Sequence, residues 1–189
     1  IPTSFADEQN SISIGMIDIA LSQTIGKASF VGEIAFGPRS FKSIPLFQPD
    51  GTDDVVVGIQ NLYASYAFTD VFSLTAGYMG TFVGYEVISP AGNFNYSTSY
   101  LFTNGPFQNS GIKADFAISD RFAFMVGLFN DWNVYQDFNG ISDFGTQLYF
   151  MPVDGWDIYV NFITGNPSGT VIDLTTGWQL TDGFYLGLN

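Results

Sequence analysis

The 189-residue chain contains no histidine and no cysteine. These absences exclude Ser-His-Asp triads, thiolate nucleophiles and zinc sites with His or Cys ligands. No disulfide can form, so the sequence leaves the redox compartment open. Basic residues are scarce as well, with 5 Lys and Arg against 18 Asp and Glu. So few cations cannot neutralise a phosphate backbone, and nucleic acid is therefore not expected as a partner.

Charged residues make up only 12% of the chain, against roughly 25% in an ordinary soluble domain. Long apolar runs are missing too. The longest, from Phe122 to Phe129, is far shorter than the ~20 residues of a membrane-spanning helix. Aromatic residues are abundant, at 17%, and a disordered chain is excluded because such chains are poor in aromatics.

The apolar residues recur with a period of two. Between residues 111 and 118, Ile112, Ala114, Phe116 and Ile118 alternate with Gly111, Lys113, Asp115 and Ala117. This pattern predicts strands with one apolar and one polar face, and no segment has a helical period. We expect about ten strands, at 11–22, 28–37, 55–68, 72–84, 110–118, 122–130, 142–151, 156–164, 170–180 and 184–189. A phase slip close to Gly15 predicts a bulge in the first strand.

Short and long connections alternate along the chain. Asp70, Asp120, Asp154 and Asp182 each lie in a short turn that an aromatic residue follows, and Asp suits tight turns because its side chain caps its own backbone. Longer connections at 41–54, 84–109, 131–141 and 165–169 lie between these turns. The alternation predicts a single all-β domain over residues 1–189, folded as an antiparallel up-and-down barrel.

Alternation alone fits both a soluble and a membrane barrel. Three features favour a transmembrane β-barrel. The apolar face of the clearer strands carries no charge, the opposite face is mildly polar, and the expected strands match the ~9–11 tilted residues that cross a bilayer. Aromatic residues also recur at strand ends, where girdles meet lipid headgroups: Phe68, Phe72, Tyr85, Phe122, Trp132, Trp156 and Phe184. A soluble β-barrel that binds an apolar ligand is the less favoured alternative.

Several blocks within residues 55–130 carry a family resemblance. They read Gly84-Tyr85-Glu86-Val87-Ile88, Asn93-Phe94-Asn95-Tyr96-Ser97, Ser99-Tyr100-Leu101-Phe102 and Gly105-Pro106-Phe107, in that order. The sequence resembles the outer-membrane β-barrel porins of the OmpL-like group in Bacteroidota, which carry such blocks in the same order. Members of that group are longer. We therefore expect the chain to be a fragment of a larger barrel that lacks an N-terminal strand and further C-terminal strands.

The resemblance implies a pore in the cell outer membrane that allows passive diffusion of small solutes or ions. The alternative is a non-conducting barrel that serves as a structural or accessory component of a cell-surface complex. The expected partners are the lipid bilayer and the solutes, with a homo-oligomer or an outer-membrane complex left open. Catalysis is not expected, because no carboxylate pair is marked for acid–base work.

Charged residues on the polar face or near strand ends are candidates for the pore lining, because charged rings set selectivity in pores. The candidates are Glu33, Arg39, Lys113, Asp115 and Arg121. The excess of acidic residues favours a weak cation preference, although acidic loops would produce the same net charge. Lys113 paired with a neighbouring Asp could equally stiffen the wall.

The long connection 84–109 could fold inward as a constriction or cap the outer rim, and we favour the constriction. Its candidate residues are Tyr85, Glu86, Asn93, Tyr96 and Tyr100. Two acidic groups, Asp50 with Asp53 and Asp54, and Asp131 with Asp137, could suggest calcium. A calcium site needs six to eight convergent oxygens, so solvated acidic loops are the preferred interpretation. No metal and no cofactor is predicted.

Overall fold

The computed structural model describes residues 5, 10, 12, 15–42 and 57–189 of the chain. Its ten strands form one antiparallel sheet in which each strand pairs with its neighbours in sequence. The strands are β1 (Ile17–Ile25), β2 (Ala28–Phe36), β3 (Val57–Ala67), β4 (Phe72–Gly80), β5 (Gln108–Ser119), β6 (Phe122–Phe129), β7 (Asp143–Phe150), β8 (Trp156–Gly165), β9 (Gly169–Thr181) and β10 (Phe184–Leu188). Helix is confined to α1 (Pro38–Lys42), α2 (Tyr100–Thr103) and the 3-10 turn η1 (Pro90–Gly92) in the described residues. No helix there is long and apolar enough to cross a membrane.

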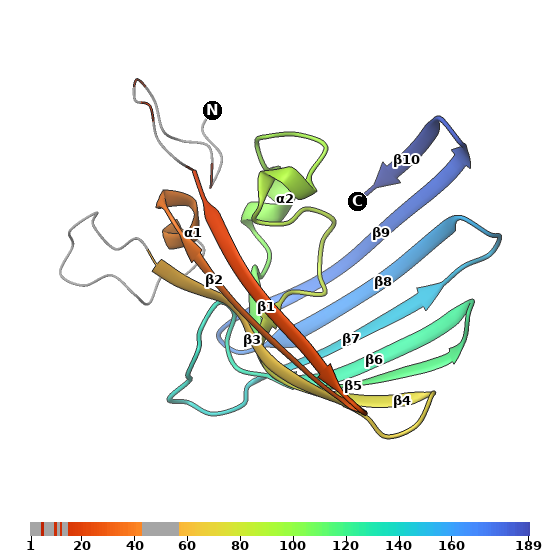
Figure 1. Cartoon of the computed structure of the whole chain (residues 1–189), viewed down its shortest axis with the longest axis horizontal. Helices are drawn as coiled ribbons and strands as arrows, with labels where there is room; N and C mark the ends of the chain where they lie inside the picture. Colours follow the sequence, from red (N-terminus) through yellow and green to blue (C-terminus); the bar gives the residue numbers. More distant parts are fainter. Residues whose placement is uncertain (1–4, 6–9, 11, 13–14, 43–56) are drawn as a thin grey trace.

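The meander predicted from the turns is confirmed. Short turns join β1 to β2, β3 to β4, β5 to β6, β7 to β8 and β9 to β10, while most of the longer connections lie at the opposite ends of the strands (Figure 1). The sheet curves strongly but is not closed, because β1 pairs only with β2 and β10 only with β9 in the described part of the chain. The all-β, up-and-down architecture is therefore correct, and these residues form an open wall rather than a complete barrel.

Strand boundaries differ most from expectation in the first and fourth strands. In the described residues the first strand runs over Ile17–Ile25 rather than 11–22, and its pairing with β2 has no register shift, so no bulge lies within it and Gly15 precedes it. Register shifts lie instead at Glu33 in β2, Ala117 in β5 and Phe184 in β10. The strand expected over 72–84 ends at Gly80, because the chain turns away from the sheet after that residue.

The two faces of the sheet differ sharply in polarity. In-register pairing aligns Ser73, Asp115, Met125, Gln147, Asn161 and Asp173 in one row across β4–β9. Alternation from this row places every charged residue of the ten strands on the same face: Asp18, Glu33, Lys113, Asp115, Asp143, Asp157 and Asp173. The opposite face exposes large apolar side chains such as Leu62 (57%), Leu128 (48%) and Leu174 (55%).

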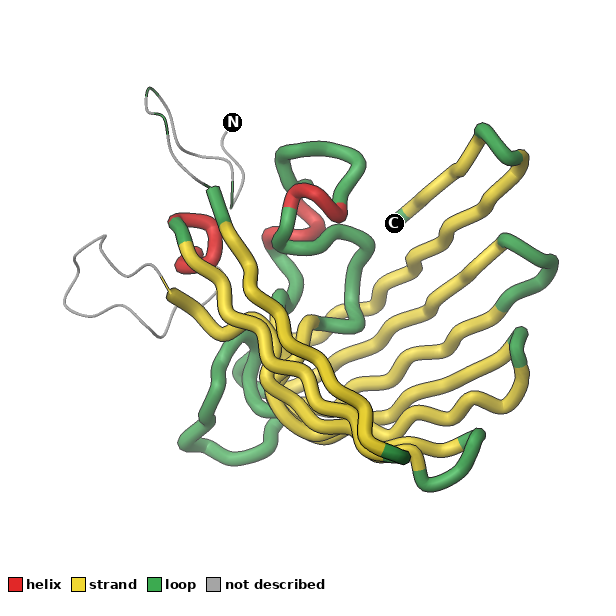
Figure 2. The backbone as a smooth tube through the Cα atoms, viewed as in Figure 1, coloured by secondary structure: helices red, strands yellow, loops and turns green. Residues whose placement is uncertain are grey.

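The buried core lies between the sheet and the β4–β5 connection, residues 81–107, which we call the inward loop. This loop and α2 lie in the hollow of the curved sheet (Figures 1 and 2). One apolar cluster joins Val83 of the loop to Phe129 and Ile163 of the sheet. A second joins Ile88 and Phe102 of the loop to Phe5. The inward loop thus packs against the polar face of the sheet, and in the described residues the apolar face stays uncovered.

Candidate functional site

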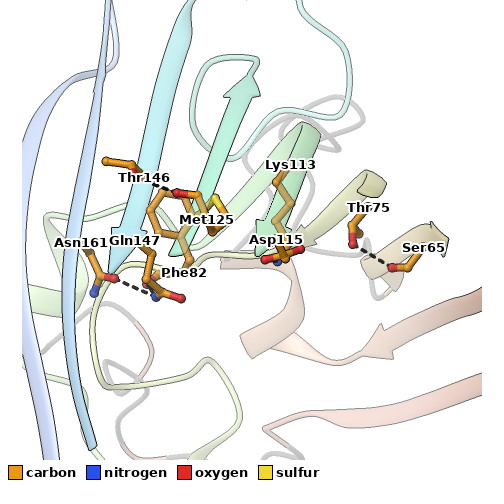
Figure 3. A network of polar contacts seen from close by, with 9 residues as sticks. All are labelled: Ser65, Thr75, Phe82, Lys113, Asp115, Met125, Thr146, Gln147 and Asn161. Atoms are coloured by element: carbon orange, nitrogen blue, oxygen red, sulfur yellow. Dashed lines mark hydrogen bonds and ion pairs between the residues drawn. The ribbon is translucent and has the colours of Figure 1, made fainter. Parts of the chain in front are cut away.

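The inward loop is bonded to the polar face of the sheet by side chains from β7 to β9. Gln147 Nε2 donates to the carbonyl of Phe82 at 3.1 Å and to Asn161 Oδ1 at 2.7 Å (Figure 3). Asn161 Nδ2 in turn donates to Asp173 Oδ2 at 2.6 Å. The same carboxylate oxygen accepts the backbone N–H of Gly84 at 2.9 Å. A row of side chains on three adjacent strands therefore ends in direct bonds to the loop backbone.

Asp173 is the main polar anchor of the loop. Besides Gly84 and Asn161, its carboxylate accepts a hydrogen bond from Asn189 Nδ2, and Asn189 Oδ1 accepts the N–H of Tyr85 at 3.3 Å. Hydrogen bonds to a charged group contribute about 1.5–3 kcal/mol each. The loop is therefore fixed to β9 at its first residues.

A glycine makes room for the apolar part of this contact. An ideal Cβ on Gly145 would lie 2.6 Å from Phe82 Cζ and 2.9 Å from Phe129 Cε2. The two rings lie 5.8 Å apart between centroids. Phe82 can reach the sheet at this point because β7 carries no side chain there.

Of the five loop residues singled out from the sequence, four make contacts within the loop or to neighbouring elements, and the fifth, Tyr100, is exposed. Tyr85 OH donates to Tyr185 OH of β10 at 3.0 Å, and burial together with this bond raises the pKa of Tyr85 to about 12. Glu86 accepts the N–H and the hydroxyl of Ser99. Asn93 bonds both backbone groups of Val87. Tyr96 lies under the guanidinium of Arg39, and Tyr100 is exposed at the start of α2.

Three of the candidate pore-lining residues lie on the polar face. Asn61 Nδ2 donates to Glu33 Oε2 at 2.5 Å across β2 and β3. Lys113 Nζ lies 2.9 Å from Asp115 Oδ1 on the same strand, beside the Ser65–Thr75 hydroxyl pair (Figure 3). Because the two charges are opposite, the Lys113–Asp115 pair adds little net charge to the wall, and because both side chains are part-exposed it adds little stability.

The two arginines lie elsewhere. Arg39 is buried in α1, where Nε donates to the Ile88 carbonyl at 2.6 Å and Nη1 to the Phe5 carbonyl at 3.0 Å. Burial lowers the pKa of this guanidinium, and its contacts tie the end of β2 to the inward loop. Arg121 is exposed in the β5–β6 turn and pairs with Asp154 of the next turn at 2.7 Å.

Sequence reasoning missed the residues that anchor the loop. Gln147, Asn161 and Asp173 stand in the polar phase of strands that the alternation identified correctly. The polar phase was the one signal in the sequence that could have identified them, because it predicts that they share a face of the sheet. Their convergence on one backbone segment depends on the strand register and on the path of the loop.

The acidic loop groups have ordinary structural partners where they are described. Asp50, Asp53 and Asp54 lie outside the described residues. Asp137 accepts the backbone N–H groups of Asp131 and Asn139, which lower the pKa of its carboxyl. No group of three acidic side chains in the described residues is placed to hold a metal ion.

The exposed face carries a ladder of aromatic rings near the short turns. Ring centroids of Tyr66, Phe68, Phe72, Phe116 and Phe124 follow one another at 4.5–5.3 Å across β3–β6. Trp156 and Trp178 stack at 4.7 Å on β8 and β9. Tyr85 and Trp132 were predicted to belong to an aromatic girdle, but they lie away from these rings on the exposed face. Tyr85 faces β10 from the inward loop, and Trp132 packs against the cluster around Phe129.

Comparison with known proteins gives one family. The family model described as Putative beta-barrel porin-2, OmpL-like matches residues 1–189. No curated protein and no solved structure matches the chain.

Proposed function

The chain belongs to the family of OmpL-like β-barrel porins. We propose that it forms part of the wall of an outer-membrane pore through which small solutes or ions diffuse passively. The observation that carries this proposal is the sorting of charge in the sheet. All strand charges stand on the face that holds the inward loop, and the other face exposes apolar side chains and aromatic ladders. A lipid-facing charge at the bilayer midplane would cost about 2–4 kcal/mol.

This polarity argues against the soluble alternative. A soluble barrel would carry its apolar side chains inside, whereas here the hollow is lined by Asn161, Gln147 and Asp173. A porin family also favours transport over catalysis. An origin in the Bacteroidota remains a prediction of the sequence resemblance.

The inward loop acts as the constriction in this proposal. It lies in the hollow of the sheet, and its first residues are bonded to β7, β9 and β10. The spaces between this loop and the surrounding strands include cavities of about 340, 340 and 220 Å³. Spaces of this size suit water, ions and small solutes rather than polymers.

The test is single-channel recording in planar bilayers with the protein extracted in detergent from its native membrane. Stepwise, ohmic conductance is expected, and detergent from a mock extraction gives the baseline. Correctly inserted protein that stays silent would overturn the pore and leave the structural or accessory barrel as the better interpretation. Extraction into buffer without detergent would contradict both membrane functions.

A further inference from the structure

The smallest of these three cavities, about 220 Å³, has three carboxylates in its wall, those of Asp18, Glu33 and Glu86. It lies between the inward loop and the ends of β1–β4, with Val83 and Ile88 on the loop side and Asp18 and Glu33 on the sheet side. Asp18 of β1 and Glu33 of β2 share the polar face, because Glu33 pairs with Ala20, two residues beyond Asp18. The two acids are therefore diagonal neighbours on adjacent strands.

No positive side chain lines this space among the described residues. The Arg39 guanidinium does not line the cavity and donates to the backbone carbonyls of Ile88 and Phe5. Glu86 also lines the cavity, but its carboxylate is held by Ser99. Glu33 accepts one hydrogen bond, from Asn61 Nδ2 to Oε2, whereas both oxygens of Glu86 are bonded to Ser99. We therefore take Asp18 and Glu33 as the carboxylates that act on a passing solute.

A neutral oxygen in the same wall lacks a donor. Gln108 lines the cavity and is only 3% exposed. Its Nε2 donates to Gln60 Oε1 at 3.0 Å, while its own Oε1 accepts no hydrogen bond. A buried amide oxygen without a donor is costly, and its lone pairs add negative rather than positive potential to this wall.

We propose that this cavity selects cations, so that the pore passes small monovalent cations, with their water, in preference to anions. The inference rests on the proposed function and names the solute class of the same site. Clefts lined by one sign of charge raise the local concentration of counterions by 10–10³. The rest of the polar face supports the same sign, because Asp143, Asp157 and Asp173 outnumber its one lysine, which Asp115 already pairs.

The test measures the reversal potential of the extracted protein in planar bilayers across a KCl gradient. The potassium-to-chloride permeability ratio of the wild type should be roughly 10. The double substitution Asp18→Asn with Glu33→Gln should bring this ratio down several-fold while the amides keep the side-chain shape.

The matched control is Asp70→Asn with Asp182→Asn, which removes the same net charge from two exposed turns. It should leave the permeability ratio unchanged. A wild-type ratio at or below one, or an equal fall in both double variants, would overturn the cation pathway. Either result requires current, so it is distinct from a silent protein, which would overturn the pore itself.

Discussion

At the scale of single residues, the contact between Phe82 and β7 depends on Gly145 having no side chain. We expect Gly145→Ala to push Phe82 or Phe129 aside, because the new methyl would lie under 3 Å from both rings. Overpacking of this kind costs about 1–3 kcal/mol. Thermal unfolding of the detergent-solubilised protein should therefore begin at a lower temperature than in the wild type.

The control for this substitution is Gly32→Ala in β2. A Cβ there would meet nothing within 4 Å, and the backbone of Gly32 has an ordinary φ. The two variants thus make the same chemical change in strands of one sheet. If both unfold at the same temperature, the tight packing of Phe82 on Gly145 is not what holds the loop.

The sequence pattern predicts the face of the sheet on which a residue lies, but it does not predict which residues its side chain contacts. Lys113 and Asp115 were placed on the polar face by alternation alone, and their pairing was one of the alternatives considered. Arg39 could not be placed, because its burial depends on Phe5 and Ile88, which lie 34 and 49 residues away along the chain. Long-range contacts of this kind leave no local periodic signal.

At the scale of elements, the inward loop should be released when its anchor on β9 is removed. Asp173→Ala deletes the acceptor of the Gly84 N–H and of two asparagine amides. The loss of one hydrogen bond to a charged group, about 1.5–3 kcal/mol, would raise the released population roughly tenfold or more. Because the chain has no cysteine, Val83→Cys provides a single reporter at a buried loop position, 7% exposed. Its labelling by a maleimide should accelerate by a similar factor.

Asp154→Ala is the control for this experiment, since Asp154 lies in the β7–β8 turn and pairs only with Arg121 among the described contacts. Labelling at position 83 should not change in that variant. Unchanged labelling in Asp173→Ala as well would mean that the apolar cluster around Val83, rather than the carboxylate, fixes the loop.

The elements themselves were largely predictable because alternation and turn chemistry are local. The strands predicted at 28–37, 122–130 and 156–164 agree with β2, β6 and β8 to within one residue at each end. Chain ends and loop entries were less predictable. Phe82 continues the apolar phase of β4, yet residues 81–84 leave the sheet because Phe82 and Val83 pack on β6–β8 instead of extending β4.

At the scale of the whole molecule, the two edge strands of the sheet have backbone N–H and C=O groups without a strand partner in the described residues. Within the described residues, β1 pairs only with β2 and β10 only with β9. In lipid an unpaired backbone N–H or C=O costs several kcal/mol, so open edges do not occur there. We propose that further strands of the same polypeptide pair with both edges and complete a barrel wider than ten strands.

This closure predicts the mass of the protein in its native membrane. The ten strands described here belong to 20.7 kDa of chain, so intact mass spectrometry of the extracted protein should give a clearly larger value. A folded barrel also keeps its shape in dodecyl sulfate until it is heated, and the unheated sample should migrate as one compact species. A mass of 20.7 kDa with a compact monomer would contradict the proposal, because β1 would then have to pair with β10. The same mass with a compact dimer would assign the missing strands to a second copy. In either case the hollow would be bounded differently, and the size of the solute that passes Asp18 and Glu33 would have to be derived again from that closure.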